Sequence, residues 1–174
     1  NFLYYISLSS NLVALLWKPW SVISYAFFHS DIFHILFNLL MLNFAGRLFL
    51  TFFTQKQLLS LYFVGAIFAG FVYLLGYQFL PSLSNANTSL IGASASVMAI
   101  LFATVAYAPF MEIRLLIFGQ LKLWHIALVL VIIDLVQLPM SNTGGHLSHL
   151  GGAVFGYIYI QQLKKGRDIC AWFS

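Results

Sequence analysis

The sequence predicts an all-α, polytopic membrane protein, and three observations lead to this prediction. Hydrophobic residues make up 61% of the 174 residues, and only 7% are charged. Soluble domains carry about 25% charged residues, so this chain could not cover a surface that faces water. Aromatic residues, which are part of this hydrophobic set, make up 18% of the chain, as is typical of side chains that face lipid and its interfaces. We therefore expect one membrane-embedded domain over residues 1–174, with the lipid bilayer as its surroundings.

Five apolar segments are long enough, or nearly so, to cross a bilayer as helices. A hydrocarbon core of about 30 Å requires about 20 helical residues. Turn-forming residues separate the segments, and the short connections predict antiparallel neighbours in a helical bundle. The segments cover residues 32–53, 57–79, 91–108, 121–138 and 146–163.

Residues 1–20 are apolar, but their sequence does not predict a further membrane-spanning helix. Several serines and Asn11 interrupt the stretch, which ends at Lys18-Pro19-Trp20. It is short for a span and lacks the charged start of a signal peptide. We predict an interfacial segment with Trp17 and Trp20 at the depth of the lipid headgroups.

The basic residues predict the orientation. If the five spans alternate in direction, all basic residues except Lys18 fall on one side of the membrane, which the positive-inside rule makes cytoplasmic. The opposite loops, residues 78–90 and 139–145, contain none. With a net charge of +4 and no dense basic run outside the C-terminal end, nucleic acid is not an expected partner. The cytoplasmic set is Arg47, Lys56, Arg114, Lys122, Lys164, Lys165 and Arg167.

This orientation brings three polar residues, His34, Ser94 and His149, to the outer ends of different spans. A serine and a histidine on separate helices are the minimum for covalent catalysis. Gly92 permits a tight turn before Ser94, and free N–H groups at a helix start can bind an oxyanion. The alternative is that Gly92 to Ser96 are small residues used for helix packing.

Gly152 and Gly156 form a small-xxx-small face one turn after His149. If the Ser94 helix packs on this face, His149 approaches Ser94. His146 lies one turn earlier and nearer the water, so it is less suited to be the base, and an interfacial role is its alternative.

His34 and Asn38 are four residues apart, so they share one helix face. Both side chains can donate hydrogen bonds, which suits an oxyanion site opposite the serine N–H. Asp31 could instead cap the start of this helix.

Metal and cofactor sites are not expected. Several histidines gather on the outer side, but the chain has no His-Glu-x-x-His motif and few carboxylates. The single cysteine, Cys170, excludes an internal disulfide and a multi-cysteine metal site. Asp134 lies near the outer end of the fourth span, and its partner cannot be named from the sequence.

These residues together resemble the rhomboid intramembrane serine proteases, in particular a bacterial, Bacteroidetes-like branch. Phe28-His29 and the stretch from His34 to Asn38 are similar to the family's second helix, and Gly92-Ala93-Ser94 resembles its Gly-x-Ser nucleophile motif. His149-Leu150-Gly151-Gly152, with Gly156, resembles its sixth helix. The order, spacing and shared depth of the motifs make the combination specific, and the resemblance covers nearly the whole chain.

The resemblance implies a role for each matched residue. Ser94 would be the nucleophile and His149 the general base, forming a dyad without a third acid. His34, Asn38 and the Ser94 backbone N–H would form the oxyanion hole. His29, and His146 beside the base, would lie near the entrance of the active site. Transmembrane proteins would be the substrates. Cleavage would take place in a bacterial inner membrane, at an active site open to the extracytoplasmic side. The sequence does not predict the oligomeric state.

The chain also departs from the family pattern. Five of the six core helices are found, and residues 1–20 look like the loop after the first helix, so we expect that helix to be missing from this chain. Ala95 replaces the usual glycine after the nucleophile, and Met98 replaces a tyrosine one turn further on. Two alternatives stay open: a catalytically inactive relative that binds or escorts membrane proteins, and a small transporter that uses the histidines and Asp134 as a proton path.

Overall fold

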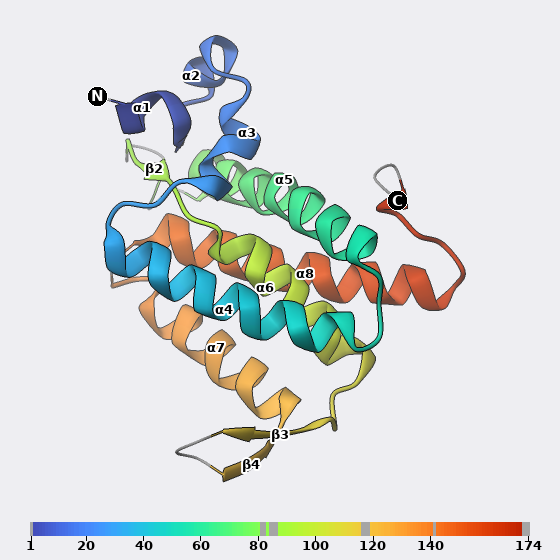
Figure 1. The fold of residues 1–174 in the computed structure, drawn as a ribbon. Helices are drawn as coiled ribbons and strands as arrows, with labels where there is room; N and C mark the ends of the chain where they lie inside the picture. The colour runs from blue at the N-terminus through green and yellow to red at the C-terminus, as the bar shows by residue number, and fades with distance from the viewer. Residues whose placement is uncertain (1, 81–82, 84–86, 116–118, 141, 172–174) are drawn as a thin grey trace.

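A computed structural model describes residues 2–80, 83, 87–115, 119–140 and 142–171. Five long helices form the bundle, which confirms the predicted all-α fold class (Figure 1). The bundle consists of α4 (Ile32–Leu50), α5 (Gln55–Phe79), α6 (Ser94–Tyr107), α7 (Leu123–Gln137) and α8 (Thr143–Lys164).

The N-terminal residues form short elements on one side of the bundle, and no described helix there is long enough to span a bilayer (Figure 1). Trp17 and Trp20 are exposed, as expected of interfacial side chains. Lys18, the exception to the charge pattern, is buried, and its ammonium group donates hydrogen bonds to the carbonyls of Tyr4 and Ser7. The elements are α1 (Phe2–Ile6), β1 (Leu8–Ser9), α2 (Leu12–Trp17), α3 (Ser21–Ser24) and the 3-10 helix η1 (Tyr25–Phe27).

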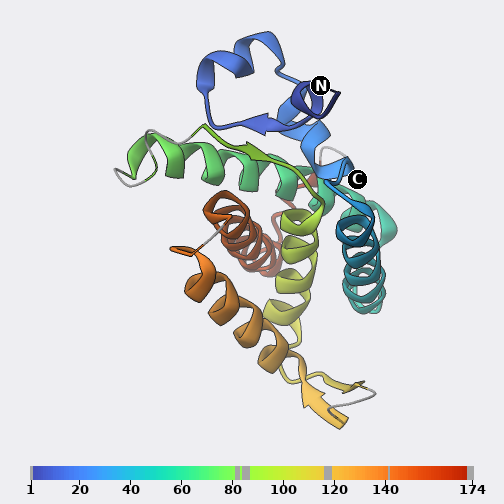
Figure 2. The same cartoon turned by 90° about the vertical axis from the view of Figure 1, so that its left-hand side faces the viewer.

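Two small antiparallel sheets were not predicted. β1 pairs with β2 (Ser89–Leu90), which ties the N-terminal segment to the approach to α6. β3 (Glu112–Leu115) and β4 (Gly119–Lys122) form a hairpin between α6 and α7. Both views place this hairpin and the N-terminal elements on opposite sides of the bundle (Figures 1 and 2).

Helix α6 lies at the centre of the bundle and packs against α4, α5, α7 and α8. Its buried positions include Ala95, Ser96, Ala99 and Ala103, whose small side chains let neighbouring backbones approach. On α8, a Cβ added at Gly152 or at Gly156 would overlap a backbone carbonyl of α6. The small-xxx-small face therefore does pack on the Ser94 helix.

Helices α4 and α5 are long and apolar enough to cross a membrane, with mean hydropathies of 1.5 and 2.2 over their most apolar stretches. Helices α6 and α7 are apolar but shorter. Large apolar side chains are exposed along the outer faces of α4 and α7, where lipid, in contrast to water, matches their chemistry. They include Ile32, Phe33, Phe37, Leu40, Val129, Ile132 and Val136.

Capping residues move the helix boundaries by up to three residues from the predicted spans. Helix α5 starts at Gln55 because Thr54 and Gln57 form a reciprocal capping box. Helix α8 starts at Thr143, three residues before the predicted start, because the Asn142 side chain accepts a hydrogen bond from the Gly145 N–H. This earlier start places His146 inside the helix rather than at its entry.

Candidate active site

Ser94 is the first residue of α6, and the turn before it depends on Gly92. Gly92 has φ +122°, a conformation that residues with a Cβ rarely adopt. Its N–H donates a hydrogen bond of 2.9 Å to the Tyr25 carbonyl, which anchors the turn to η1. A Cβ at this position would also lie 2.7 Å from His34 Nε2. The glycine therefore lets the His34 imidazole approach the start of α6.

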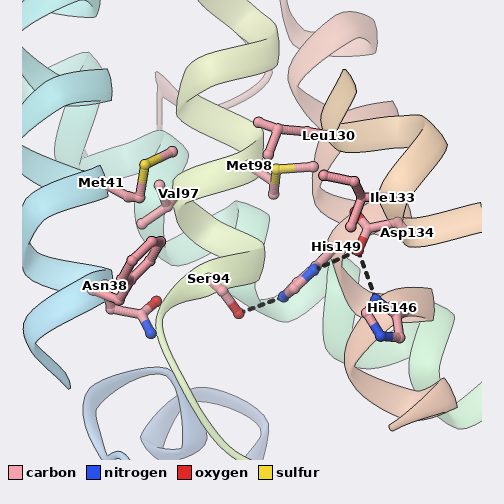
Figure 3. A pocket seen from close by; sticks show the side chains of 11 residues that line it. Asn38, Met41, Ser94, Val97, Met98, Leu130, Ile133, Asp134, His146 and His149 are labelled. Atoms are coloured by element: carbon pink, nitrogen blue, oxygen red, sulfur yellow. Dashed lines mark hydrogen bonds and ion pairs between the residues drawn. The ribbon is translucent and has the colours of Figure 1, made fainter. Parts of the chain in front are cut away.

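His149 reaches Ser94 from the facing helix α8. The distance between His149 Nε2 and Ser94 Oγ is 2.7 Å, a hydrogen-bond distance (Figure 3). The close approach of the backbones at Gly152, one turn further along α8, brings the two side chains together. The expectation that α6 and α8 bring these residues into contact is met by the geometry.

His34 and Asn38 line a cavity of about 570 Å³ together with Ser94 and His149. The Asn38 amide donates one hydrogen bond, of 2.9 Å, to the His34 carbonyl. An amide has two N–H donors, so one remains for a ligand in the cavity. Figure 3 shows the Asn38 side chain on the Ser94 side of α4. The predicted convergence of these four residues therefore agrees with the structure.

The N-terminus of α4 is stabilised by Asp31, as the capping alternative predicts. Asp31 Oδ1 accepts a hydrogen bond of 2.9 Å from the His34 backbone N–H. The hydrogen bond from this N–H is the main cause that lowers the pKa of the exposed Asp31 carboxyl group. The hydrogen bond from the Ser30 hydroxyl lowers that pKa further. Ser30 Oγ also lies 3.0 Å from His34 Nδ1, on the side of the ring opposite the nitrogen that faces Gly92.

A second, mostly apolar cavity of about 240 Å³ also borders Ser94 and lies between α4, α6 and α7. Met98, at the position where the sequence resemblance suggests a tyrosine, lines this cavity (Figure 3). The thioether is flexible and polarisable, so it can adapt to different neighbours. The other apolar lining residues include Phe37, Met41, Val97, Leu130 and Ile133.

Asp134 is the polar residue that the sequence left without a partner, and it lies directly behind His149. Its Oδ1 is 2.9 Å from His149 Nδ1 and 2.7 Å from His146 Nδ1 (Figure 3). The carboxylate is therefore shared by two histidines that lie three residues apart on α8. The sequence held one signal for this contact, since Asp134 and both histidines lie near the same outer ends of adjacent helices.

His146 and His29, the two residues expected near the entrance, each pack against another histidine of the site. His146 is only 8% exposed, because α8 begins a turn earlier and turns this side chain toward α7. His29 packs edge-on against His34, with the ring centres 5.0 Å apart, and lines a different cavity from Ser94. Burial is the main cause that lowers the pKa of His29, and the neighbouring charge of His34 lowers it further.

Ser96, the second serine near the start of α6, makes no hydrogen bond to the histidines in the described structure. Its Oγ is buried and has no hydrogen-bond partner within the described residues. Two residues along a helix correspond to a rotation of about 200°, which explains the separation from Ser94.

One group of side chains in the described part of the chain has the spacing to hold a metal ion. It consists of Asp134, His146 and His149, whose ligand atoms lie within 4.8 Å of one another. The sequence predicts no metal site because carboxylates are scarce, and this group consists of one carboxylate and two imidazoles. Both imidazole nitrogens already lie at hydrogen-bond distance from Asp134 Oδ1. Protons between these atoms satisfy all three groups without a cation.

Fold and site together describe a helical membrane protein with a serine–histidine pair at one end of the bundle. A rhomboid domain matches residues 16–165, and this chain belongs to the rhomboid family.

Two relatives have similar sequences. RHOMBOID-like protein 12, mitochondrial, from Arabidopsis thaliana is 28% identical over 158 residues, which cover 84% of this chain and 47% of that protein. Presenilin-associated rhomboid-like protein A, mitochondrial, from Danio rerio is 28% identical over 138 residues, covering 78% and 35%. This chain therefore spans less than half the length of either relative. Both relatives have mitochondrial names, so they give no support to the bacterial branch in particular.

Proposed function

We propose that this protein is an intramembrane serine endopeptidase that cleaves membrane proteins within or beside their transmembrane segments. The observation that carries the proposal is the 2.7 Å contact between Ser94 Oγ and His149 Nε2 at one end of a helical membrane bundle. Polar and ionisable groups in a membrane-embedded bundle cost free energy to bury, so a functional role is the default expectation for this pair.

The proposed reaction runs through an acyl-enzyme. His149 Nε2 takes the proton from Ser94 Oγ as the oxygen attacks the substrate carbonyl carbon. The imidazolium then gives that proton to the leaving amine as the peptide C–N bond breaks. Water, with its proton taken by the same nitrogen, then attacks the ester carbonyl. The bond between that carbon and Ser94 Oγ breaks, Oγ takes the proton back from the imidazolium, and the acid product leaves. No oxidant, metal or cofactor enters this sequence.

The oxyanion that forms during the attack would be held by donors on two helices. The Ser94 N–H, at the start of α6, has no partner within the helix. Asn38 and His34 face the same cavity from α4. Donors placed in advance around the developing charge are often the largest single contribution to catalysis.

The substrate would be a transmembrane protein. A helix in lipid satisfies its own carbonyls, so the scissile segment has to unwind before Ser94 can attack. The apolar cavity beside Ser94 suits an apolar side chain next to the cut. We propose that the Ser94 end faces the extracytoplasmic side, because Arg47, Lys56 and Lys164 lie at the other ends of their helices. A bacterial inner membrane is the compartment that the sequence resemblance suggests.

The test is labelling of the detergent-solubilised protein with a fluorophosphonate, which reacts with activated serines. We expect the wild type to incorporate one probe per chain, and the Ser94→Ala variant to incorporate none. A folded wild type that stays unlabelled would contradict the proposal and favour the alternative of an inactive relative that binds membrane proteins. Mass spectrometry of the labelled peptide identifies the modified serine.

A separate variant tests the oxyanion site. Asn38→Ala should lower kcat for peptide cleavage by about 10²- to 10³-fold with little change in KM, because the amide donates most strongly to the charge of the transition state. The matched control is Asn43→Ala on the same helix, since Asn43 is exposed and bonds only Arg47 in the described structure. Equal effects of the two substitutions would remove Asn38 from the proposed site.

A further inference from the structure

Asp134 is unusual among the residues that attach α7 to the bundle. The described structure of α7 has three buried residues: Leu123, Ala127 and Asp134. Asp134 is the only ionisable one among them and is 4% exposed. A buried carboxylate contributes less to packing than an apolar residue of similar size would, because its desolvation must be offset. The use of one of three anchoring positions for a carboxylate therefore points to a function beyond packing.

The contacts of Asp134 determine which ring nitrogen of His149 carries the proton. An ionised carboxylate only accepts hydrogen bonds, so the imidazole nitrogen beside it, His149 Nδ1, must be the donor. A neutral imidazole then keeps its lone pair on Nε2. That nitrogen is the one that lies 2.7 Å from Ser94 Oγ. The three side chains thus form a continuous chain from the serine to the carboxylate (Figure 3).

We propose that Asp134 is the positioning residue for His149: it holds the imidazole in the tautomer that can accept the Ser94 proton and stabilises the imidazolium that results. This inference rests on the proposed roles of Ser94 and His149. The Ser94 proton moves to Nε2 while the new Oγ–carbon bond forms, and Asp134 stays ionised throughout. The protein would therefore work with a serine–histidine–aspartate triad, in contrast to the dyad that the sequence resemblance implies.

His146 has a supporting part in the same arrangement. Its Nδ1 lies 2.7 Å from the same Oδ1 atom, and the described ion pairs of Asp134 are those with the two imidazoles. A second donor offsets part of the cost of burying the carboxylate and restrains its rotation. It also keeps Asp134 in place behind His149 when the His149 ring moves during the reaction.

A purely structural role for Asp134, as a tether between α7 and α8, predicts different kinetics. A tether affects how α7 lies against the bundle, so its loss would change substrate access and appear mainly in KM. The loss of the correct tautomer affects the chemical step and appears in kcat. The two roles therefore separate in one set of measurements.

The first experiment compares the labelling rates of the wild type and the Asp134→Asn variant with a fluorophosphonate, and their kcat and KM with a cleavable membrane substrate. An amide can donate to Nδ1 and thereby favour the wrong tautomer, so we expect a loss of about 10²- to 10⁴-fold in labelling rate and in kcat, with KM nearly unchanged. Asp168→Asn, far along the chain in the C-terminal segment, is the matched control and should react like the wild type. His146→Gln should cost less than Asp134→Asn, because the bond between Asp134 and His149 remains.

Labelling of Asp134→Asn at a rate within threefold of the wild type, with Ser94→Ala still unlabelled, would overturn this inference and leave the proposed protease function intact. A loss confined to KM would likewise overturn it in favour of the tether.

A second measurement does not depend on activity. Nitrogen-15 NMR of histidine-labelled protein distinguishes Nδ1–H from Nε2–H imidazoles, and the chain has only five histidines to assign. We expect His149 to carry its proton on Nδ1 in the wild type and to shift toward Nε2–H in Asp134→Asn. An unchanged His149 tautomer in the variant would overturn the inference even if the wild type proved unreactive toward every probe.

Discussion

Replacing Ser94 or His149 with alanine should lower the rate of substrate cleavage by about 10⁴- to 10⁶-fold, and replacing both should cost no more than replacing either one. The nucleophile and its base act as a unit, so the first removal already destroys the reaction path and the second has nothing further to remove. The rate that remains would come from substrate binding and the oxyanion donors alone. A suitable measurement is single-turnover cleavage of a reconstituted single-span membrane protein with a Gly-Gly pair near the outer end of its helix.

Ser96→Ala is the matched control for this series. Ser96 is on the same helix and fully buried, but its hydroxyl has no hydrogen-bond partner in the described structure. Its removal should leave cleavage within about twofold of the wild type, since no bond is lost. If the double variant were slower than both single variants by a factor equal to the product of their effects, Ser94 and His149 would act independently and the paired mechanism would fail.

A second large effect is expected from a single methyl group at the contact between α6 and α8. In Gly152→Ala, the added Cβ overlaps the Ala95 carbonyl oxygen, and a backbone atom cannot move aside by changing rotamer. The helices must separate, which costs about 1–3 kcal/mol for overpacking. The separation also moves His149, one turn away, from Ser94. We expect a lower unfolding temperature in detergent together with a fall of at least tenfold in fluorophosphonate labelling.

Gly46→Ala provides the comparison, because Gly46 is also in a helix interior but a Cβ there would meet only the Leu58 side chain, at an ordinary 3.5 Å. Alanine favours the helix over glycine by about 0.5–1 kcal/mol, so this variant should be as stable as the wild type or more so. Equal stability and labelling of Gly152→Ala and Gly46→Ala would show that the close approach of α6 and α8 does not position the pair.

The convergence of His34, Ser94 and His149 could be predicted from the sequence because it follows from counting spans. When successive helices alternate in direction, the N-termini of the first, third and fifth helices lie on the same side of the membrane. This holds whatever the rotation of each helix about its own axis. The contact of Asp134 with His149 could not be predicted in this way. It depends on the rotation of α7 about its own axis, and a helix that is apolar on nearly every side gives no stripe from which that rotation can be read.

The strand pair β1–β2 was also not predicted, because again no local sequence pattern indicates the contact. Its two strands are two residues each and lie about 80 residues apart in the chain, so no local pattern marks them. The start of α8 was misjudged because it depends on Asn142, whose φ of 47° and side-chain cap are properties of the folded turn. The misplaced boundary then led to a water-facing position for His146, which is buried.

The shortness of α6 has a consequence for the path of water. With 14 residues, this helix is about 21 Å long. A hydrocarbon layer is about 30 Å thick, so α6 is shorter than the layer by roughly 9 Å. Helices α4, α5, α7 and α8 surround α6, so protein and not lipid fills the difference. Water that reaches Ser94, the first residue of α6, is therefore expected to pass between protein side chains at a depth where lipid surrounds the bundle.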